Sequence, residues 1–452
     1  MSAEHKTKAV DNAVSRSYEL YAQAEELIPG WTQLISRRSS QFAHGVSPVY
    51  AQSAKGSRFV DVDGHEYLDW INAVGAVVLG HADEAVDNAV KAQIDRGSIY
   101  TLNSPLEIEL ARELNDTFPS SEMVRYTKGG GEACAVAARI ARGFSGRDKI
   151  LICGYHGWHD WYQAANFNAD PESGEYPFAG IEPIGVPRGL AGTVIPFTYG
   201  DLDMLKDLLE AHRGELAAIM MEPARSELPP SGYLEAVKEL AAANDVILIF
   251  DEVSIAWRLC LGGIQKQVGV TPDMTVVAKA MSNGYPMGAV LGARRIMEPA
   301  GRMFVSSSYW SDNVGLAAAL TTIRQLKKLD APKRFAAIGA SLRQALEGAI
   351  SSAGLSGGCT GLRTNPAISL QLPEGTNARQ VATLFTQEMA RRKVHCHMGF
   401  QPTLAHTEAD IAQTGEAAAE ALAVIKGGLE QGNLAELLSV EPKQDPFRRL
   451  VR

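Results

Sequence analysis

Short, continuously apolar runs alternate with segments of helical periodicity through the middle of the chain. The apolar runs lie at 149–153, 216–221, 246–250 and 274–278. Between them, apolar side chains recur at helical spacing over 201–213 and 231–244. A strand that is apolar at every position is typical of a parallel sheet covered on both faces. The alternation therefore predicts an α/β fold in which helices cross over between parallel strands.

The flanking segments predict further helices and one β-hairpin. Residues 58–70 alternate apolar and polar side chains around Asp63-Gly64, a dipeptide typical of tight hairpin turns. Helical spacing covers 11–28, 83–96, 105–117, 313–328, 332–353, 377–392 and 409–431, and further strands are expected at 289–291 and 367–372. The glycine-rich stretch 354–364 indicates a segment boundary. We expect a large domain over 58–330 and a small α+β domain formed by 1–57 with 331–452.

Composition and charge exclude several classes of function. The 452 residues carry a net charge of −9, and no basic run suited to a nucleic-acid backbone is present. The N-terminal segment lacks the apolar core of a signal peptide, and no stretch reaches the ~18 apolar residues of a membrane span. The five cysteines have no C-x-x-C spacing, which favours reduced thiols. We expect a cytoplasmic protein that binds neither nucleic acid nor membrane.

Two of the apolar runs end in charged side chains. The run 246–250 stops at Asp251, and the run 274–278 stops at Lys279. Ligands of open α/β sheets bind beyond the carboxyl ends of the strands. A carboxylate and an amine at that edge suit pyridoxal 5'-phosphate (PLP), whose aldehyde reacts with a lysine and whose ring nitrogen pairs with an acidic side chain. A buried ion pair, or two unrelated surface charges, would give the same two residues.

A glycine run, Lys128-Gly129-Gly130-Gly131-Glu132, directly precedes an alanine-rich helix. Backbone N–H groups at the positive end of a helix suit a phosphate group. The run has neither the G-x-G-x-x-G fingerprint nor a Walker loop, which argues against a nicotinamide dehydrogenase. A flexible turn at a helix start would explain these glycines equally well.

Aromatic and histidine side chains stand between glycines in residues 154–160, GYHGWHD. His156, His159 and Asp160 could hold a metal ion, but no second ligand cluster with zinc-like spacing accompanies them. We therefore expect no metal.

Taken in chain order, these motifs resemble class III (ornithine-type) aminotransferases of fold type I, and above all their glutamate-1-semialdehyde aminomutase-like branch. The resemblance runs from about Leu27 to the C-terminal helix. It is carried by IPG at 28–30, FVDVDGHEYLDW at 59–70, LGHADEAV at 79–86, GGGEACAVAARIARGFSGRDKI at 129–150, GYHGWHD at 154–160, EP at 222–223, FDEV at 250–253, LGGIQKQVGVTPD at 261–273 and AKAMSNGYPMGAV at 278–290. It implies PLP as cofactor and a large domain with a mostly parallel seven-stranded sheet beside a smaller α+β domain.

The resemblance also implies roles for individual residues. Lys279 falls on the lysine that forms the Schiff base and moves protons, and Asp251 on the carboxylate that keeps the pyridine nitrogen protonated, so that the ring can accept electrons. The other matching positions are Gly129, Gly130 and Gly131 in the phosphate loop, Tyr155 stacked on the ring and followed by His156, Val253 behind the ring, Glu222 beside the site, and Ser308 near the residue that reaches the phosphate from a neighbouring subunit. The role of Ser308 implies a homodimer with shared active sites.

Two departures from the family pattern stand out. The phosphate loop is Lys-Gly-Gly-Gly where the family has Asn-Ser-Gly-Thr, so backbone N–H groups must replace hydroxyl contacts. After Val253, the chain has Ser-Ile-Ala-Trp-Arg where the family usually ends in Gly-Phe-Arg, and Trp257 could reshape a nearby wall. Neither departure affects Lys279 or Asp251.

The resemblance leaves the reaction open, because one fold supports several reactions. We expect an aminotransferase that moves an amino group from a small, acidic β- or ω-amino compound to a keto acid. The alternative is an aminomutase or ammonia-lyase that acts on an amino acid or aminophosphonate without a keto-acid acceptor. Arg37 and Arg38 follow the IPG motif, and a guanidinium would suit the acid group of the substrate. A solvated surface pair is the other interpretation of these two arginines.

Overall fold

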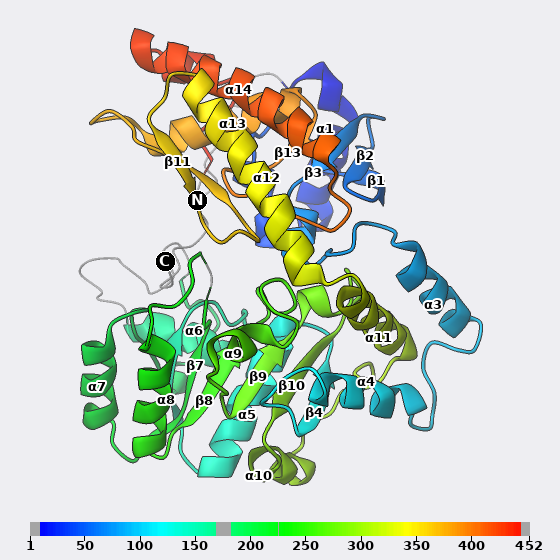
Figure 1. Ribbon diagram of the computed structural model, residues 1–452, viewed down its shortest axis with the longest axis vertical. Coiled ribbons are helices and arrows are strands. Elements are labelled where there is room, and N and C mark those ends of the chain that lie inside the picture. Colours follow the sequence, from blue (N-terminus) through cyan, green and yellow to red (C-terminus); the bar gives the residue numbers. More distant parts are fainter. Residues whose placement is uncertain (1–9, 169–181, 225, 444–452) are drawn as a thin grey trace. The chain divides into compact units, whose positions relative to one another are not determined.

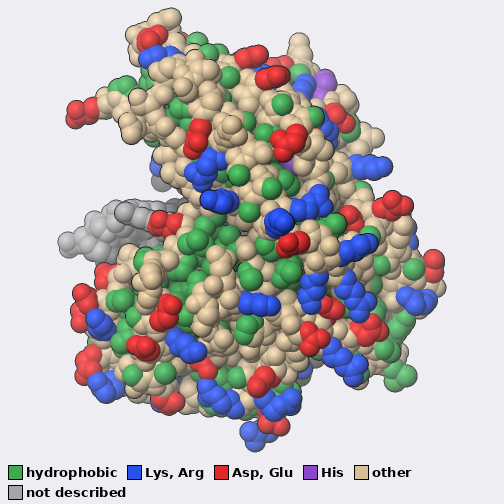
Figure 2. Space-filling model, viewed as in Figure 1, with side chains coloured by type: hydrophobic (Ala, Val, Ile, Leu, Met, Phe, Trp, Pro, Cys, Tyr) green, Lys and Arg blue, Asp and Glu red, His purple; other side chains and the backbone are tan. Residues whose placement is uncertain are grey.

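A computed structural model describes residues 10–168, 182–224 and 226–443 of the chain (Figure 1). The chain forms two compact units. Unit 1 contains the chain up to Asp83 and again from Lys333, and unit 2 contains Glu84–Pro332. None of the helices in the described ranges is both long and apolar enough to cross a membrane. On the face drawn in Figure 2, basic and acidic side chains are interspersed over each unit.

Unit 1 includes the β-hairpin that we expected in the large domain. Strands β2 (Arg58–Asp61) and β3 (Glu66–Asp69) pair antiparallel, as predicted. Strand β3 also pairs with β13 (Val394–His395), and Leu68 shares a core with the C-terminal helices. The first boundary therefore follows Asp83 instead of residue 57, because pairing and a common core join the hairpin to the C-terminal segment. The second boundary follows Pro332, two residues beyond the expected position.

The sheet of unit 1 has the order β1-β2-β3-β13. The other elements are α1 (Ser15–Leu27), β1 (Ala51–Lys55), α2 (Asn72–Gly75), α12 (Ala331–Ser352, which begins before the boundary), β11 (Gly357–Thr360), β12 (Ala367–Leu370), α13 (Ala378–Arg391), α14 (Glu408–Gln431) and α15 (Leu434–Leu437). The glycine-rich stretch 354–364, expected to be a boundary, instead contains β11, which pairs antiparallel with β12. Apolar side chains of α12, α13 and α14 form the main core of the unit.

Unit 2 is built on a seven-stranded sheet of order β4-β10-β9-β8-β7-β5-β6, which confirms the expected α/β fold. The strands are β4 (Met123–Thr127), β5 (Lys149–Cys153), β6 (Val194–Pro196), β7 (Leu216–Met221), β8 (Ile247–Asp251), β9 (Met274–Val277) and β10 (Gly288–Gly292). Only the two pairs that β10 makes are antiparallel among these described strands. The four apolar runs of the sequence are β5, β7, β8 and β9.

Successive side chains of the central strands fill two separate cores. In β5, Ile150 and Ile152 pack into the core that contains α5 (Gly130–Ser145). Leu151 and Cys153 pack into the core that contains α7 (Leu202–Ala211) and α8 (Tyr233–Ala243). Since alternate side chains point to opposite faces of a sheet, both faces are covered, which explains why these strands are apolar at every position. The remaining α-helices in the described part of unit 2 are α3 (Glu84–Ile94), α4 (Pro105–Asn115), α6 (Asp160–Gln163), α9 (Gly263–Val268), α10 (Arg294–Met297) and α11 (Asn313–Lys328).

His406 is a buried histidine in unit 1 whose two ring nitrogens are both bonded. Its ring stacks on Trp70 with centroids 3.7 Å apart. Nδ1 accepts the backbone N–H of Thr403 at 2.9 Å, and Nε2 donates to the carbonyl of Asp69 at 3.1 Å. Burial lowers the pKa of His406 from 6.5 to about 4. The folded unit therefore holds this ring in its neutral form.

The neutral His406 should make stability depend on pH. Between pH 6.5 and about 4 the unfolded chain binds a proton that the folded chain does not, so stability falls as pH falls, by up to about 3 kcal/mol. Urea unfolding should show the native protein losing more free energy of unfolding between pH 7 and pH 4.5 than His406→Gln, which cannot take up that proton. Equal losses in the two proteins would contradict the assignment.

Candidate active site

Three neighbouring parallel strands end in the acidic and basic side chains of the site. Asp251 is the last residue of β8, Lys279 follows β9, and Glu222 follows β7. The order β9-β8-β7 places these ends side by side at the carboxyl edge of the sheet. Lys279 has a φ of 43°, a left-handed conformation that a residue with a side chain seldom adopts. Its Nζ donates to Ser254 Oγ at 3.1 Å.

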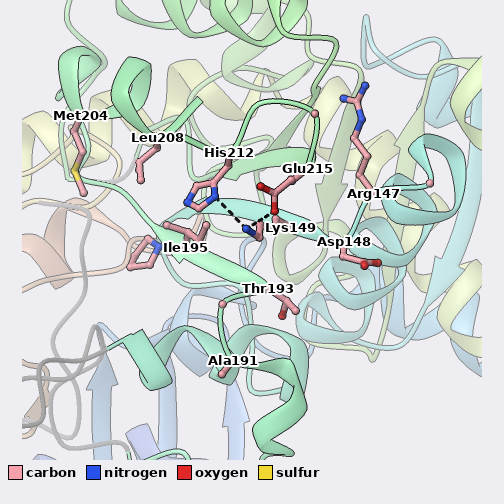
Figure 3. A pocket seen from close by; sticks show the side chains of 14 residues that line it. Arg147, Asp148, Lys149, Ala191, Thr193, Ile195, Met204, Leu208, His212 and Glu215 are labelled. Carbon is pink, nitrogen blue, oxygen red and sulfur yellow. Dashed lines mark hydrogen bonds and ion pairs between the residues drawn. The ribbon is translucent and has the colours of Figure 1, made fainter. Parts of the chain in front are cut away.

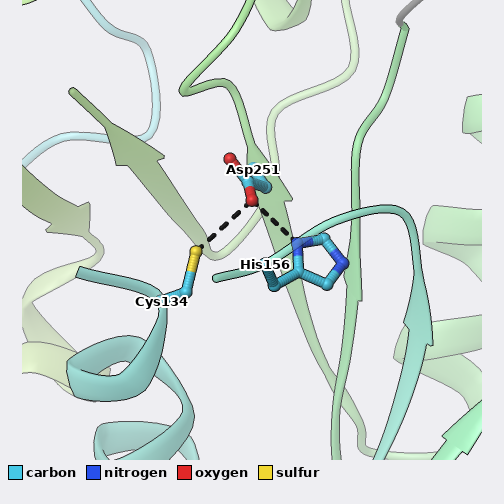
Figure 4. A group of neighbouring side chains, drawn as sticks. All are labelled: Cys134, His156 and Asp251. Carbon is cyan, nitrogen blue, oxygen red and sulfur yellow. Dashed lines mark hydrogen bonds and ion pairs between the residues drawn. The ribbon is translucent and has the colours of Figure 1, made fainter. Parts of the chain in front are cut away.

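Asp251 is a buried carboxylate that accepts hydrogen bonds on both oxygens. Oδ2 accepts from His156 Nδ1 at 2.7 Å and from the Cys134 thiol at 3.3 Å (Figure 4), while Oδ1 accepts the backbone N–H of Val253 at 3.0 Å. Because a carboxylate only accepts, His156 carries its proton on Nδ1. An ionised carboxylate has about four acceptor positions, so about one remains for a further donor. A protonated ring nitrogen is a donor of that kind.

Cys134, His156 and Asp251 are also the one group of potential metal ligands whose atoms lie within 4.8 Å of one another among the described residues. Their spacing favours hydrogen bonds. Two ligands of a tetrahedral Zn²⁺ lie about 3.3 Å apart or more, whereas His156 and Asp251 are separated by 2.7 Å. The set considered from sequence does not assemble, because His156 faces Asp251 while His159 stacks on Trp158.

The glycine run lies at the start of α5, and Gly130 and Gly131 are closely packed there. A Cβ on Gly130 would lie 2.9 Å from a methyl group of Val253, and a Cβ on Gly157 would lie 2.6 Å from the Cα of Gly131. The run therefore packs against both the end of β8 and the loop 154–160. The first N–H groups of an α-helix have no carbonyl partner within the helix, so those of Gly130 and Gly131 can serve a phosphate.

Glu222 shapes the turn that carries Tyr155. Its Oε2 accepts the backbone N–H of Tyr155 at 3.0 Å, and the side chain is 4% exposed. Gly154 has a φ of 126°, and a Cβ there would lie 2.7 Å from the same oxygen, so only glycine fits. The ring of Tyr162 meets both Tyr155 and His156 edge-on, with centroids 6.0 and 5.5 Å away. Tyr155 and His156 are thus held as a pair above the strand ends.

Ser308, Arg37 and Arg38 are the remaining expected site residues. Ser308 is in an exposed segment of unit 2. Arg37 and Arg38 belong to unit 1, where Arg37 lines a cavity of about 460 Å³ together with aromatic side chains such as Trp31 and Tyr50. Arg38 instead packs beneath Gly30, with Nη2 3.0 Å from the position of a Cβ there. The structure therefore distinguishes two arginines that the sequence could not.

A second cavity, of about 850 Å³, lies near the opposite end of the sheet of unit 2 (Figure 3). Lys149, the first residue of β5, contributes to its wall. The Nζ of Lys149 forms an ion pair with Glu215 and lies 3.1 Å from His212 Nδ1, and Arg147 pairs with Asp245. These cations are already satisfied by protein groups, and the cavity is remote from the carboxyl edge.

Two residues that make polar contacts in the site, Cys134 and Ser254, were not expected there from the sequence. Cys134 was grouped with the buried cysteines, and Ser254 was noted only as a departure from the family pattern. The one available signal for Cys134 was its place near the start of the helix that begins in the glycine run. Its contact with Asp251 joins residues 117 positions apart and needs the fold to be seen.

Together these groups fit PLP. Lys279 offers an amine for the aldehyde, and Asp251 offers an acceptor for the ring nitrogen. The backbone N–H groups at the start of α5 suit the phosphate, and Tyr155 offers an aromatic face for the ring. Each group comes from a different loop at the same edge of the sheet.

Comparison with known proteins agrees with this arrangement. The family model of class-III aminotransferases matches residues 41–357. A 3-aminobutyryl-CoA aminotransferase of Cloacimonas acidaminovorans is 34% identical, over 91% of this chain and 98% of the relative. A glutamate-1-semialdehyde 2,1-aminomutase of Methanosarcina acetivorans is 34% identical, over 76% of this chain and 80% of the relative. Among solved structures, the PLP internal aldimine form of the FumI protein of Sphingopyxis sp. MTA144 superposes with a TM-score of 0.84 at 25% identity, covering 95% of this chain and 99% of that one.

The fold, the site chemistry and these similarities agree on one kind of enzyme. The model match covers well over half of the chain, and the first relative matches almost from end to end. The expected cofactor is thereby confirmed at the level of the family. The protein belongs to the class III aminotransferase family of PLP-dependent enzymes.

Proposed function

We propose that the protein is an aminotransferase that moves an amino group from a small, acidic β- or ω-amino compound to a keto acid. The observation that supports the proposal most directly is the environment of the buried Asp251 carboxylate. It accepts three hydrogen bonds, which leaves about one acceptor position for a further donor. Its strand, β8, lies next to β9, and Lys279 follows β9. The Lys279 amine donates to Ser254 Oγ at 3.1 Å.

The bound cofactor supplies an aldehyde for the amino group and a ring that accepts electrons from the substrate's Cα. Lys279 would hold the cofactor through its amine, and the same amine would take the proton from the substrate's Cα and return it. Ser254 Oγ accepts a hydrogen bond from that amine and orients it. Asp251 keeps the proton on the ring nitrogen.

The remaining residues hold the cofactor in place. Gly129, Gly130 and Gly131 would offer backbone N–H groups to the phosphate, and Val253, which lies against Gly130, would lie behind the ring. Tyr155 supplies the face on which the ring stacks, and Glu222 fixes the backbone of that tyrosine. His156 holds Asp251 through Nδ1.

Arg37 binds the acid group of the amino substrate in this proposal. Arg37 lines the cavity of unit 1 together with aromatic side chains, and a planar guanidinium suits an acid group. Arg38 is the matched control, since it is adjacent in sequence but packs beneath Gly30. The acidic character of the substrate rests on this assignment.

Replacing Arg37 with Ala should raise KM for the acidic amino substrate by about 10- to 100-fold, the usual effect of losing a hydrogen bond to a charged group. Replacing Arg38 with Ala should leave KM within about twofold, because no substrate contact is lost. Steady-state kinetics of both variants tests the assignment. Unchanged kinetics in both variants would show that neither arginine binds the acid group. An increase in KM confined to Arg38→Ala would assign that role to Arg38.

The relatives include two reaction types, and one assay separates them. The aminotransferase acts on a 3-aminobutyryl thioester by its name, which supports a β-amino substrate, whereas the other relative is an aminomutase. A transaminase requires an acceptor, so turnover should need 2-oxoglutarate, pyruvate or another keto acid. Multiple turnovers of an amino substrate without any acceptor would instead establish a mutase or a lyase.

The proposal also includes a homodimer with shared active sites, in which Ser308 contributes to the phosphate site of the partner. Support comes from the segment around Ser308, where Phe304 is 86% and Tyr309 68% exposed in the single chain. Large aromatic side chains are enriched in protein interfaces. Sedimentation velocity should give twice the mass of the chain, and a monomer that is active when dilute would contradict the shared site.

A further inference from the structure

Cys134, the fifth residue of α5, contacts the carboxylate at the centre of the site. The side chain is 1% exposed, and its Sγ lies 3.3 Å from Asp251 Oδ2. The same oxygen accepts from His156, and the other oxygen accepts from the N–H of Val253 (Figure 4). Asp251 therefore receives donors from three elements: helix α5, the loop 154–160 and the turn after β8.

The thiol is the donor in this contact. Burial and, after it, the charge of Asp251 raise the pKa of Cys134 well above that of an ordinary cysteine. The S–H proton is therefore retained, and a carboxylate can only accept it. A thiolate at residue 134 would place a second negative charge next to Asp251, away from water. Cys134 would have to be a thiolate to bind a metal ion, so the retained proton also disfavours a metal site.

The three hydrogen bonds to Asp251 together fix the orientation of its carboxylate, and the thiol contributes one of them. A carboxylate bonded through one oxygen can rotate about its Cβ–Cγ bond. Bonds to both oxygens, with two donors on Oδ2, fix the plane of the Asp251 carboxylate and the direction of its remaining acceptor position. In the proposed function Val253 lies behind the ring and His156 follows Tyr155, whereas Cys134 lies on a helix that is packed into the core.

We propose that Cys134 is a positioning residue, whose thiol, together with His156, holds the Asp251 carboxylate in the orientation that pairs with the ring nitrogen of the cofactor. The inference rests on the role of Asp251 in the proposed function. It adds a residue to the site that contacts neither substrate nor cofactor.

Cys153 provides a matched control. It is also fully buried and its pKa is also raised by burial, yet no hydrogen bond joins its thiol to any described residue. It packs on the opposite face of the sheet, in the core with α7 and α8. Cys153→Ala removes a buried thiol without removing a contact to Asp251.

Infrared difference spectra test the contact directly. The spectrum of native apoprotein minus Cys134→Ala should contain an S–H stretching band at lower frequency than the band from native minus Cys153→Ala, because hydrogen bonding weakens the S–H bond. Asp251→Asn should move the Cys134 band to higher frequency, since the charged acceptor is lost, and leave the Cys153 band in place. The proposal would be overturned if the Cys134 and Cys153 bands had the same frequency. It would also be overturned if the Cys134 band did not move in Asp251→Asn, or if no Cys134 band appeared.

Cofactor affinity tests the consequence. Cys134→Ala should weaken PLP binding by about threefold to tenfold, the effect of one modest hydrogen bond, and Cys153→Ala should not. Equal losses in the two variants would show a packing effect and overturn the role of Cys134. Asp251→Asn separates this inference from the proposed function. If Asp251→Asn binds PLP and reacts as the native protein does, the proposed function is wrong. If Asp251→Asn is strongly impaired but Cys134→Ala binds PLP normally, only the role of Cys134 is refuted.

Discussion

Replacing Lys279 with Ala should lower kcat by at least about 10³-fold, because one side chain both anchors the cofactor and moves the proton at Cα. The residue lies at the carboxyl end of β9, in a strained left-handed conformation that aims its amine at Ser254. Alanine leaves the backbone intact, so the loss should appear in kcat with the fold preserved. Single-turnover kinetics with an amino donor measures the effect.

Two comparisons make the Lys279 result specific. Lys266→Ala removes an exposed lysine of α9 and should leave kcat unchanged. Small primary amines added to Lys279→Ala should restore part of the rate, since they can replace the missing base. A Lys279→Ala enzyme that turns over at the native rate would remove the residue from the mechanism.

Replacing Asp251 with Asn should lower kcat by on the order of 10²- to 10³-fold, the usual cost of removing one preorganised electrostatic group. Asparagine keeps an oxygen that can accept from His156 and nearly the same volume, so the effect should come from the lost charge. Without that charge the ring nitrogen is not held protonated, and the ring accepts electrons from Cα less well. The measurement is kcat over a range of pH, with circular dichroism as the control for folding.

The contrast with substrate binding sharpens the Asp251 prediction. Asp251→Asn should reduce kcat and kcat/KM together, whereas Arg37→Ala should act mainly on KM. If Asp251→Asn raised KM and left kcat intact, Asp251 would belong to substrate binding.

The strands buried on both faces could be predicted from sequence, whereas the marginal strands could not. β5, β7, β8 and β9 are apolar at every position because helices cover both faces of the sheet. β1, with the sequence AQSAK, is exposed along most of its length, and β11, with the sequence GGCT, has no large apolar side chain. Such strands exist because a partner strand completes their hydrogen bonds, and a local pattern does not contain that information.

The domain boundary has a similar explanation. The segment 58–83 is adjacent in sequence to unit 2, but the pairing of β3 with β13 and the burial of Trp70 join it to residues more than 300 positions away. Predicting that boundary would have required the long-range pairing itself.

The residues of the site were proposed from a resemblance, and the structure adds the contacts among them. It brings Glu222, Asp251, Lys279 and Tyr155 to one edge of the sheet, as the strand ends predicted. It also gives a reason for Gly131 where the family has threonine: a Cβ at residue 131 would lie 3.3 Å from the Cα of Gly157 and 3.4 Å from His159. Glycine at residue 131 lacks the threonine hydroxyl, but it lets the glycine run approach the loop 154–160 closely.

The central claim is that Lys279 and Asp251 hold one PLP molecule and pass amino groups through it. The most direct measurement is the absorbance spectrum of the native protein reconstituted with PLP, followed during additions of an amino donor and then a keto acid. We expect an absorbance band near the visible edge that is absent in Lys279→Ala, bleaches with the donor and returns with the keto acid. A native protein that stays colourless after reconstitution, or a band that persists in Lys279→Ala and ignores every amine, would contradict it.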